Sequence, residues 1–157
     1  MKIILLTVGK TADKELVGAI ERYAARIKHY APFEFRQLPD VKTTRNTTEA
    51  KQKELEGQAI LQQVQPGDRV VLLDERGKEY TSRQFSGVIS DAMVSLQRNL
   101  FFVIGGPYGF SSEVYDRANG MIALSRMTLT HEMVRLFFVE QIYRAFTILR
   151  GEPYHHD

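Results

Sequence analysis

The residues best placed for chemistry follow three short apolar segments of the chain. These polar or glycine-rich stretches are residues 74–77, residues 105–109 and residues 125–129. In an open parallel sheet, ligands bind beyond the carboxyl ends of the strands. We therefore expect the three stretches to lie side by side around a ligand.

The stretch 105–109 has the strongest local character. Gly105, Gly106 and Gly109 allow a backbone to approach a ligand closely and expose amide donors. The spacing matches neither the G-x-G-x-x-G nor the Walker pattern, and Pro107 removes an amide from any phosphate cradle. The alternative interpretation is a tight strand–helix connection that binds no ligand, and it explains the same glycines equally well.

The remaining reactive side chains favour neither a metal nor a nucleophile. His29, His131, His155 and His156 form no i, i+4 pair, and the neighbouring carboxylates do not complete a ligand set. The adjacent pair at the C-terminus could be the remnant of a tag, although tags are normally longer. No G-x-S-x-G elbow is present, so the sequence offers little machinery for hydrolysis.

Apolar runs alternate with helical stripes along the chain, and these elements must position the candidate residues. Strands are expected at residues 3–8, 33–35, 69–73, 101–104 and 121–124. Helices are expected at residues 16–30, from Thr47 or Thr48 to about 64, at 85–96, from Ser111 or Ser112 to 118, and at 132–150. The alternation, with continuously apolar strands, predicts one domain over residues 1–157. Its fold is α/β, with a mostly parallel, Rossmann-like sheet flanked by helices.

Composition places the chain among ordinary globular proteins and excludes several classes. Of the 157 residues, 43% are apolar and 25% are charged, which argues against disorder. The absence of cysteine excludes disulfides and thiolate sites and fits a reducing compartment. The apolar run at residues 3–8 is too short for a signal peptide, and nothing approaches the ~18 residues of a membrane span. These features predict a cytoplasmic protein.

Charge alone does not predict a nucleic-acid partner. Lys and Arg number 21 against 19 for Asp and Glu, so the net charge is only +2. RNA binding would therefore depend on local groups rather than on bulk charge. The candidate basic residues are Lys10, Lys14, Arg22, Arg26, Arg76, Lys78 and Arg126.

The last expected helix is apolar around most of its circumference. Its apolar residues cover far more than the ~100° stripe of a helix that is buried on one side. One side must pack on the sheet, and a second subunit is the simplest cover for the other. The sequence therefore predicts a homodimer. The alternative is a helix enclosed within a single chain.

Four ordered motifs carry a resemblance to a known family. They are residues 103–109 (VIGGPYG), 124–131 (LSRMTLTH), 139–145 (VEQIYRA) and 153–155 (PYH), and residues 1–10 match as well. The chain resembles, over essentially its whole length, the RlmH family of small SPOUT-class methyltransferases of large-subunit ribosomal RNA. The resemblance makes His155 part of the native tail. The loop 39–48 and the last two residues vary from the pattern.

The resemblance implies an activity and an architecture. It implies methylation, dependent on S-adenosyl-L-methionine, of N3 of a pseudouridine in helix 69 of 23S rRNA. Such a donor needs no metal, and the low net charge of this small chain favours the assembled ribosome as the partner. It also implies a homodimer and a SPOUT α/β knot, with a C-terminal trefoil knot. The positions implied to contact the cofactor are Leu73, Gly105, Leu124, Ser125, Arg126, Met127, Thr128 and Leu129.

Residue chemistry supplies the catalytic candidates. The sulfonium already activates the methyl group, but N3 of a uracil-type ring must lose a proton to a general base. His155 and His131 are the candidates for this base, although His131 could equally be a residue of the helix N-terminus with no such role. Tyr154 could stack on the target base, and Arg135 and Arg144 could bind phosphate or build an interface.

Two other functions stay open at this point. The first is a SPOUT methyltransferase that acts on another RNA such as tRNA, although such enzymes often carry an added RNA-binding domain. The second is a non-enzymatic α/β module that binds a nucleotide. The motif 124–129 and the tail 154–155 speak against the second.

Overall fold

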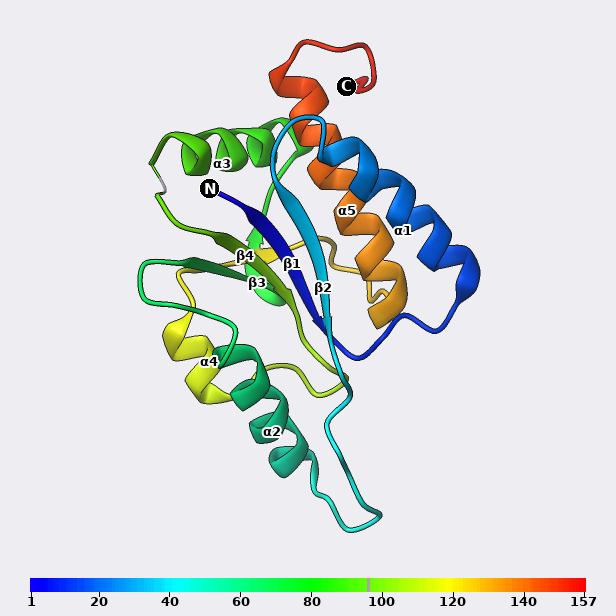
Figure 1. Ribbon diagram of the computed structural model, residues 1–157, viewed down its shortest axis with the longest axis vertical. Coiled ribbons are helices and arrows are strands. Elements are labelled where there is room, and N and C mark those ends of the chain that lie inside the picture. The colour runs from blue at the N-terminus through cyan, green and yellow to red at the C-terminus, as the bar shows by residue number, and fades with distance from the viewer. Residues whose placement is uncertain (96) are drawn as a thin grey trace.

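Strands and helices alternate along the chain, as the apolar pattern predicts, in the computed structural model, which describes residues 1–95 and 97–157 (Figure 1). The strands are β1 (Ile3–Val8), β2 (Phe33–Leu38), β3 (Arg69–Glu79), β4 (Leu100–Ile104) and β5 (Gly120–Ala123). The helices are α1 (Lys14–Ile27), α2 (Glu49–Leu61), α3 (Ser82–Ser95), α4 (Ser112–Arg117) and α5 (His131–Leu149). Leu96, which the pattern assigned to the third helix, lies outside the described residues.

The described strands form one sheet in the order β2-β1-β4-β3-β5, and every neighbouring pair runs parallel. The predicted α/β class and parallel sheet are therefore confirmed. Because the strands share one direction, their carboxyl ends meet at the lower edge of the sheet in Figure 1. Leu73 of β3 is in register with Ile104 of β4 and with Ile122 of β5, so residues 74–77 of β3 begin at the same edge as the polar stretches that follow β4 and β5.

Helices cover both faces of the sheet, which explains why its strands are continuously apolar. Along β1, Ile3 and Leu5 face an apolar cluster that includes residues of α1, α3 and α5. The alternating residues Ile4 and Leu6 face a second cluster with residues of α2 and α4. Each residue of β1 is thus buried on one face or the other.

Side-chain caps fix where the helices begin. Of the two possible caps of α2, Thr48 fills the role, and its Oγ1 accepts from the N–H of Lys51 at 3.1 Å. Ser111 caps α4 directly after the glycine stretch, and Thr130 caps α5 directly after residues 124–129. Both candidate ligand loops therefore lead at once into a helix.

The enclosed-helix alternative accounts for much of the apolar character of α5. The helix lies on one face of the sheet and packs against both α1 and α3. Phe138, Val139 and Ile142 are fully buried in this way. Met133 and Phe137 nevertheless remain 43% and 40% exposed, so the chain leaves part of this helix uncovered.

The third strand is longer than the sequence predicts. The apolar run ends at Leu73, but the strand continues to Glu79. Ile122 of β5 is in register with Leu73 and again with Lys78, with an irregularity between the two. The extension was missed because it depends on backbone pairing with β5 and not on apolar side chains.

Replacing Gly77 by Ala is expected to destabilise the fold by on the order of 3 kcal/mol. A Cβ at Gly77 would lie 2.6 Å from the backbone of both Met121 and Ile122, and backbone cannot move aside cheaply. Gly87 in α3 is the matched control because a Cβ there meets nothing within 4 Å. Denaturant unfolding should show Gly87→Ala at or above wild-type stability. Equal stability of both variants would contradict the close passage of β3 over β5.

Candidate functional site

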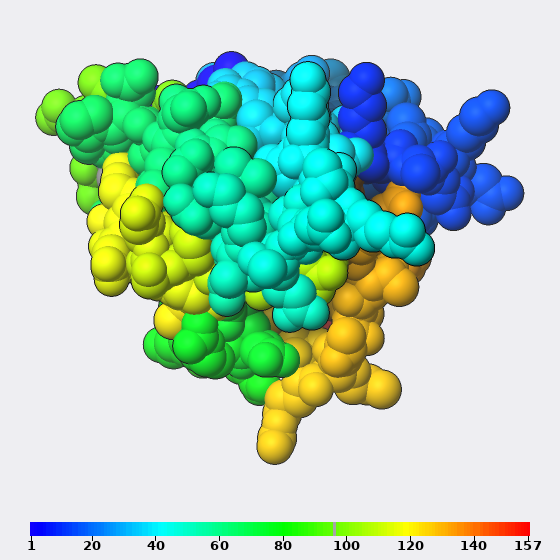
Figure 2. All heavy atoms as spheres, turned by 90° about the horizontal axis from the view of Figure 1, so that it is seen from below, coloured from blue at the N-terminus to red at the C-terminus, as the bar shows by residue number. Residues whose placement is uncertain are grey.

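Two adjoining cavities lie at the carboxyl edge of the sheet. The larger, of about 710 Å³, is lined by residues 73–76 of β3, by the loop that follows β4 and by the start of α5. The smaller, of about 180 Å³, is lined by the segment after β5. This segment, residues 124–129, is golden in Figure 2, which views the molecule from the same edge, and it projects from the surface. Five residues line both cavities, namely Leu73, Asp74, Glu75, Leu129 and Val134.

The structure brings together all the positions that the resemblance assigned to a cofactor. Gly105 lines the larger cavity, Leu73 and Leu129 line both, and the rest line the smaller one. That remaining group consists of Leu124, Ser125, Arg126, Met127 and Thr128. The arrangement offers apolar walls for a ring system. Their role in binding stays a prediction.

Asp74 places a fixed negative charge beside these walls. It accepts a short hydrogen bond from the hydroxyl of Tyr115 and one of 2.9 Å from the N–H of Arg76. Burial acts to raise the pKa of Asp74, but these hydrogen bonds hold it below its ordinary value. The carboxylate is therefore ionised near neutral pH and could accept from hydroxyls or attract a cationic group.

The glycines of residues 105–109 have structural reasons of their own. A Cβ at Gly105 would lie 3.1 Å from the ring of Phe110. Gly109 has a φ of +81°, and its N–H donates to the carbonyl of Gly106 at 3.2 Å. Packing and turn geometry, rather than a ligand alone, therefore require these glycines. The tight-connection alternative explains the shape of the loop, although the loop also lines the larger cavity.

Of the four catalytic candidates, His131 lies beside the cavities. It is the first residue of α5, is exposed and lines the larger cavity. Arg135, one turn later, is only 1% exposed. Its Nη1 donates to the carbonyl of Gly9 at 2.9 Å and its Nη2 to the carbonyl of Val8 at 3.0 Å. Because the guanidinium fastens α5 to the loop after β1, it faces no substrate in this conformation.

Replacing Arg135 by Met is expected to lower the free energy of unfolding by on the order of 2–3 kcal/mol, because two buried carbonyls lose their donors. Arg22→Met, on the exposed face of α1, is the control and should change stability little. Chemical denaturation measures both. A stable Arg135→Met protein with a large loss of kcat would instead return this residue to the catalytic set.

Tyr154 and His155 form a polar cluster with the last turns of α5. The hydroxyl of Tyr154 donates to Glu140 at 2.9 Å, and Arg144 contacts the same carboxylate at 2.6 Å. Burial, followed by hydrogen bonding to Tyr23 and Glu140, raises the pKa of Tyr154, so its phenol stays protonated. Glu140 was not expected in this cluster, although its i, i+4 spacing from Arg144 is visible in the sequence.

The ring nitrogens of His155 are both engaged in this cluster. Nδ1 lies 3.1 Å from Nη1 of Arg144, which can only donate, so Nδ1 accepts. Nε2 lies 3.0 Å from Oδ1 of Asp157, whose carboxylate also accepts from Nε of Arg83 at 2.8 Å. His155 therefore has one ring nitrogen that accepts from a cation and one that faces a carboxylate.

The catalytic candidates thus occupy two ends of one helix. His131 begins α5 beside the cavities, whereas Tyr154 and His155 follow its last turn. A helix of this length spans ~28 Å at 1.5 Å per residue. Figure 1 places the C-terminal tail at the opposite end of the molecule from the carboxyl edge of the sheet. Within one chain, the tail and the cavities do not form a single site.

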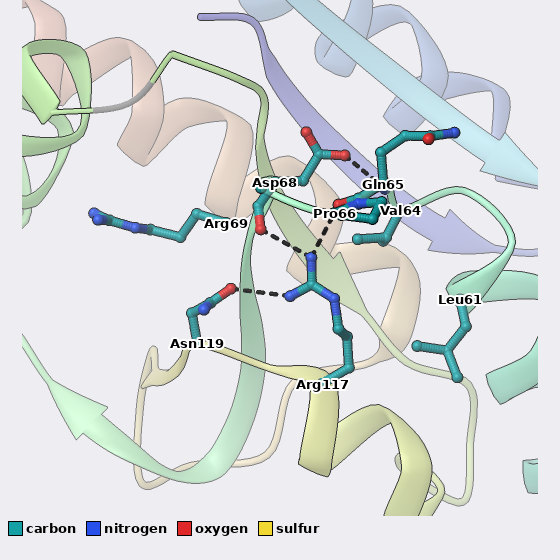
Figure 3. Close-up of a pocket in the computed structure, with 9 residues that line it drawn as sticks. Leu61, Val64, Gln65, Pro66, Asp68, Arg69, Arg117 and Asn119 are labelled. Atoms are coloured by element: carbon teal, nitrogen blue, oxygen red, sulfur yellow. Dashed lines mark hydrogen bonds between the residues drawn. The ribbon is translucent and has the colours of Figure 1, made fainter.

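Another cavity of about 710 Å³ lies near the amino ends of β3 and β5 (Figure 3). There Arg117 donates to the carbonyls of Gln65 and Asp68, at 3.1 and 2.9 Å. It also donates to the side-chain oxygen of Asn119 at 3.2 Å. Arg117 therefore joins the turn before β3 to the end of α4, and its hydrogen bonds here are structural.

Metal sites and membrane-spanning helices were considered for the described residues. No group of three or more His, Cys, Asp and Glu side chains among them could hold a metal ion. None of the helices in residues 1–95 and 97–157 combines the length and apolar character needed to cross a membrane.

Comparison with protein families and curated sequences gives consistent matches. A family model described as "Predicted SPOUT methyltransferase" matches residues 1–155. A protein of Parabacteroides distasonis named "Ribosomal RNA large subunit methyltransferase H" is 54% identical over 157 residues, 100% of both chains. A protein of the same name from Christiangramia forsetii is 56% identical over 156 residues, 99% of each chain.

Solved structures share the fold at much lower identity. A probable methyltransferase from Bordetella pertussis aligns with a TM-score of 0.56 and 11% identity, over 92% of this chain and 93% of its own. A probable methylase family protein from Haemophilus influenzae aligns with a TM-score of 0.53 and 11% identity, over 95% of this chain and 66% of its own. These two similarities concern the fold alone.

Proposed function

This chain belongs to the SPOUT methyltransferase family, and on that premise we propose that it methylates large-subunit ribosomal RNA with S-adenosylmethionine as donor. The full-length similarity to relatives named for this activity carries the proposal. The gathering of the eight expected cofactor positions around two adjoining cavities supports it. We propose N3 of a pseudouridine in helix 69 as the target atom.

The residues around the cavities suit the donor. Leu73, Leu129 and Val134 supply apolar contact for an adenine ring, and Asp74 and Glu75 supply acceptors for ribose hydroxyls or an ammonium group. When bound, S-adenosylmethionine supplies a methyl group that its sulfonium has already activated. The protein's task is then to hold N3 in line with that methyl group, which can lower a barrier by ~7–11 kcal/mol.

The target nitrogen must also lose a proton. A positioned general base contributes ~10²–10⁴-fold. His131 lies at the cavities, and His155 has a ring nitrogen that could take up a proton once it is released from Arg144. We propose that the tail, with Tyr154 and His155, approaches the target base.

A second copy of the chain would bring the tail to the cavities. The exposed Met133 and Phe137 give α5 an apolar strip on its free side. Two copies packed antiparallel along this strip would place the tail of each near the start of α5 of the other. We propose a homodimer in which each active site combines the donor cavities of one chain with the tail of its partner.

The resemblance also implies a trefoil knot in the C-terminal part of the chain, which we retain as a proposal. The register of Ile122 with both Leu73 and Lys78 supports it, because β3 must pass closely around β5. Gly77 permits that passage. We also place the enzyme in the cytoplasm, where its ribosomal substrate would be found.

Methyl transfer to intact ribosomes is expected to exceed transfer to a free helix 69 stem-loop. The chain carries a net charge of only +2, so one subunit makes few phosphate contacts and binds naked RNA weakly. The measurement compares kcat/KM for intact ribosomes, the stem-loop and bulk tRNA. Equal rates on ribosomes and stem-loop would contradict the size and charge argument. Faster transfer to tRNA would overturn the proposed substrate.

A further inference from the structure

Glu56 is a buried carboxyl group in a helix with otherwise many exposed residues. Its side chain is 3% exposed and lies against Gly106, the second glycine of the loop that lines the donor cavity. A Cβ at Gly106 would lie 2.7 Å from Cδ of Glu56 and 2.8 Å from its Oε1. The contact therefore requires a residue without Cβ at position 106, and it suits the planar carboxyl group of Glu56.

The next residue of α2 contacts the other end of the same loop. A Cβ at Gly57 would lie 3.2 Å from Cβ of Ser111, the residue that caps α4. One turn later, Ile60 shares an apolar cluster with Phe110 and Val114. Helix α2 thus contacts the loop at both ends, and Glu56 is the residue of α2 that lies against Gly106.

The environment of Glu56 favours a neutral acid. Its Oε1 is buried and, among the described residues, has no hydrogen-bond partner. A cavity of about 210 Å³ adjoins it, and the other titratable side chains that line this cavity are Asp40 and His131. Burial raises the pKa of Glu56 above 4.5 and the charge of Asp40 adds to this, while a hydrogen bond with Gln52 opposes it.

We propose that Glu56 is a positioning residue for the methyl donor, because its buried carboxyl group packs against Gly106 and holds the loop 105–109 in the shape that lines the donor cavity. Gly106 and Pro107 line both this small cavity and the larger donor cavity. If the side chain of Glu56 moves, Gly106 and Pro107 can therefore move with it and change the wall of the larger donor cavity. This inference rests on the proposed function, since it takes the donor to be S-adenosylmethionine.

The proposal predicts how donor affinity depends on pH. Below the raised pKa of Glu56 the carboxyl is neutral and the contact is intact. As pH rises through that pKa, the group ionises, and a buried carboxylate whose Oε1 has no hydrogen-bond donor among the described residues must move toward water. Affinity should therefore fall with rising pH in the wild type.

The test is titration calorimetry with S-adenosylhomocysteine between about pH 5 and about pH 9, a range that spans carboxyl and imidazole titration. Glu56→Ala is expected to weaken binding about tenfold, equivalent to about 1.4 kcal/mol. Glu56→Gln, which is flat and neutral, is expected to keep the wild-type affinity of low pH and not to weaken further through ionisation at this position. Glu54→Gln, exposed on the same helix, is the control and should follow the wild type. Every other titratable group is unchanged between the wild type and Glu56→Gln, so the difference between their two profiles isolates Glu56.

Wild-type affinity in Glu56→Ala, or equal losses in the Ala and Gln variants, would overturn the positioning role. A Glu56→Gln profile parallel to the wild type would do the same and decides the matter even if the Ala variant does not fold. A wild type that binds no S-adenosylhomocysteine at any pH would overturn the proposed function itself, which distinguishes the two failures.

Discussion

A chain carrying His155→Ala, mixed with a chain carrying Leu129→Glu, is expected to recover methyl transfer that neither variant has alone. Leu129→Glu places a carboxylate in the apolar wall shared by both donor cavities. His155→Ala removes the tail imidazole, with an expected loss of ~10²-fold or more if it acts as the base. If each active site combines one chain's cavities with its partner's tail, a mixed dimer contains one intact site.

The size of the recovery is set by symmetry. Random exchange gives half mixed dimers, each with one working site of two, so activity should return to about a quarter of wild type. The measurement is methyl transfer to intact ribosomes before and after the two variants are unfolded and refolded together. Each variant refolded alone is the control. No recovery, with mixed dimers demonstrated by mass spectrometry, would contradict the shared site.

Replacing Phe137 by Arg is expected to separate the dimer and to lower methyl transfer by ~10²-fold or more. Phe137 is 40% exposed on the free side of α5, next to the exposed Met133 one turn earlier. A buried aromatic at the centre of an interface commonly contributes 2 kcal/mol or more, and an arginine in its place would be buried without a partner.

Light scattering at micromolar concentration gives the test. The wild type should show about twice 18.0 kDa, and Phe137→Arg should show the monomer mass. Ala50→Arg, on an exposed position of α2 across the sheet from α5, is the control and should remain dimeric. A monomeric wild type with full activity would remove both the dimer and the shared site.

The sheet could be predicted well because its buried strands appear in the sequence as runs of apolar residues. The residues of β1 and β4 are apolar except for Thr7, since helices cover both faces. The second half of β3 could not be predicted, because residues 74–79 pair through their backbone while their side chains are mostly exposed and polar. The enclosure of α5 by α1 and α3 is likewise a tertiary arrangement that the periodicity of one helix does not reveal.

The candidate site likewise has a part that the sequence predicts and a part that depends on tertiary packing. The cofactor positions follow strand ends, so parallel topology alone gathers them. Arg135 was expected at the site, but its place on α5 turns it toward the carbonyls of the loop after β1. Glu56 was not expected at the site, because nothing in the weakly patterned sequence of α2 marks a carboxyl group that packs against a distant glycine.

Mass spectrometry of ribosomal RNA nucleosides tests the central claim most directly. Intact ribosomes from cells that lack this gene would be incubated with the purified protein and S-adenosylmethionine, then digested and compared with untreated ribosomes. The proposed function predicts one new methylated nucleoside, N3-methylpseudouridine, and its loss when Leu129→Glu replaces the wild type. An unchanged nucleoside profile with the wild-type protein, or a methyl group on another base, would contradict the account.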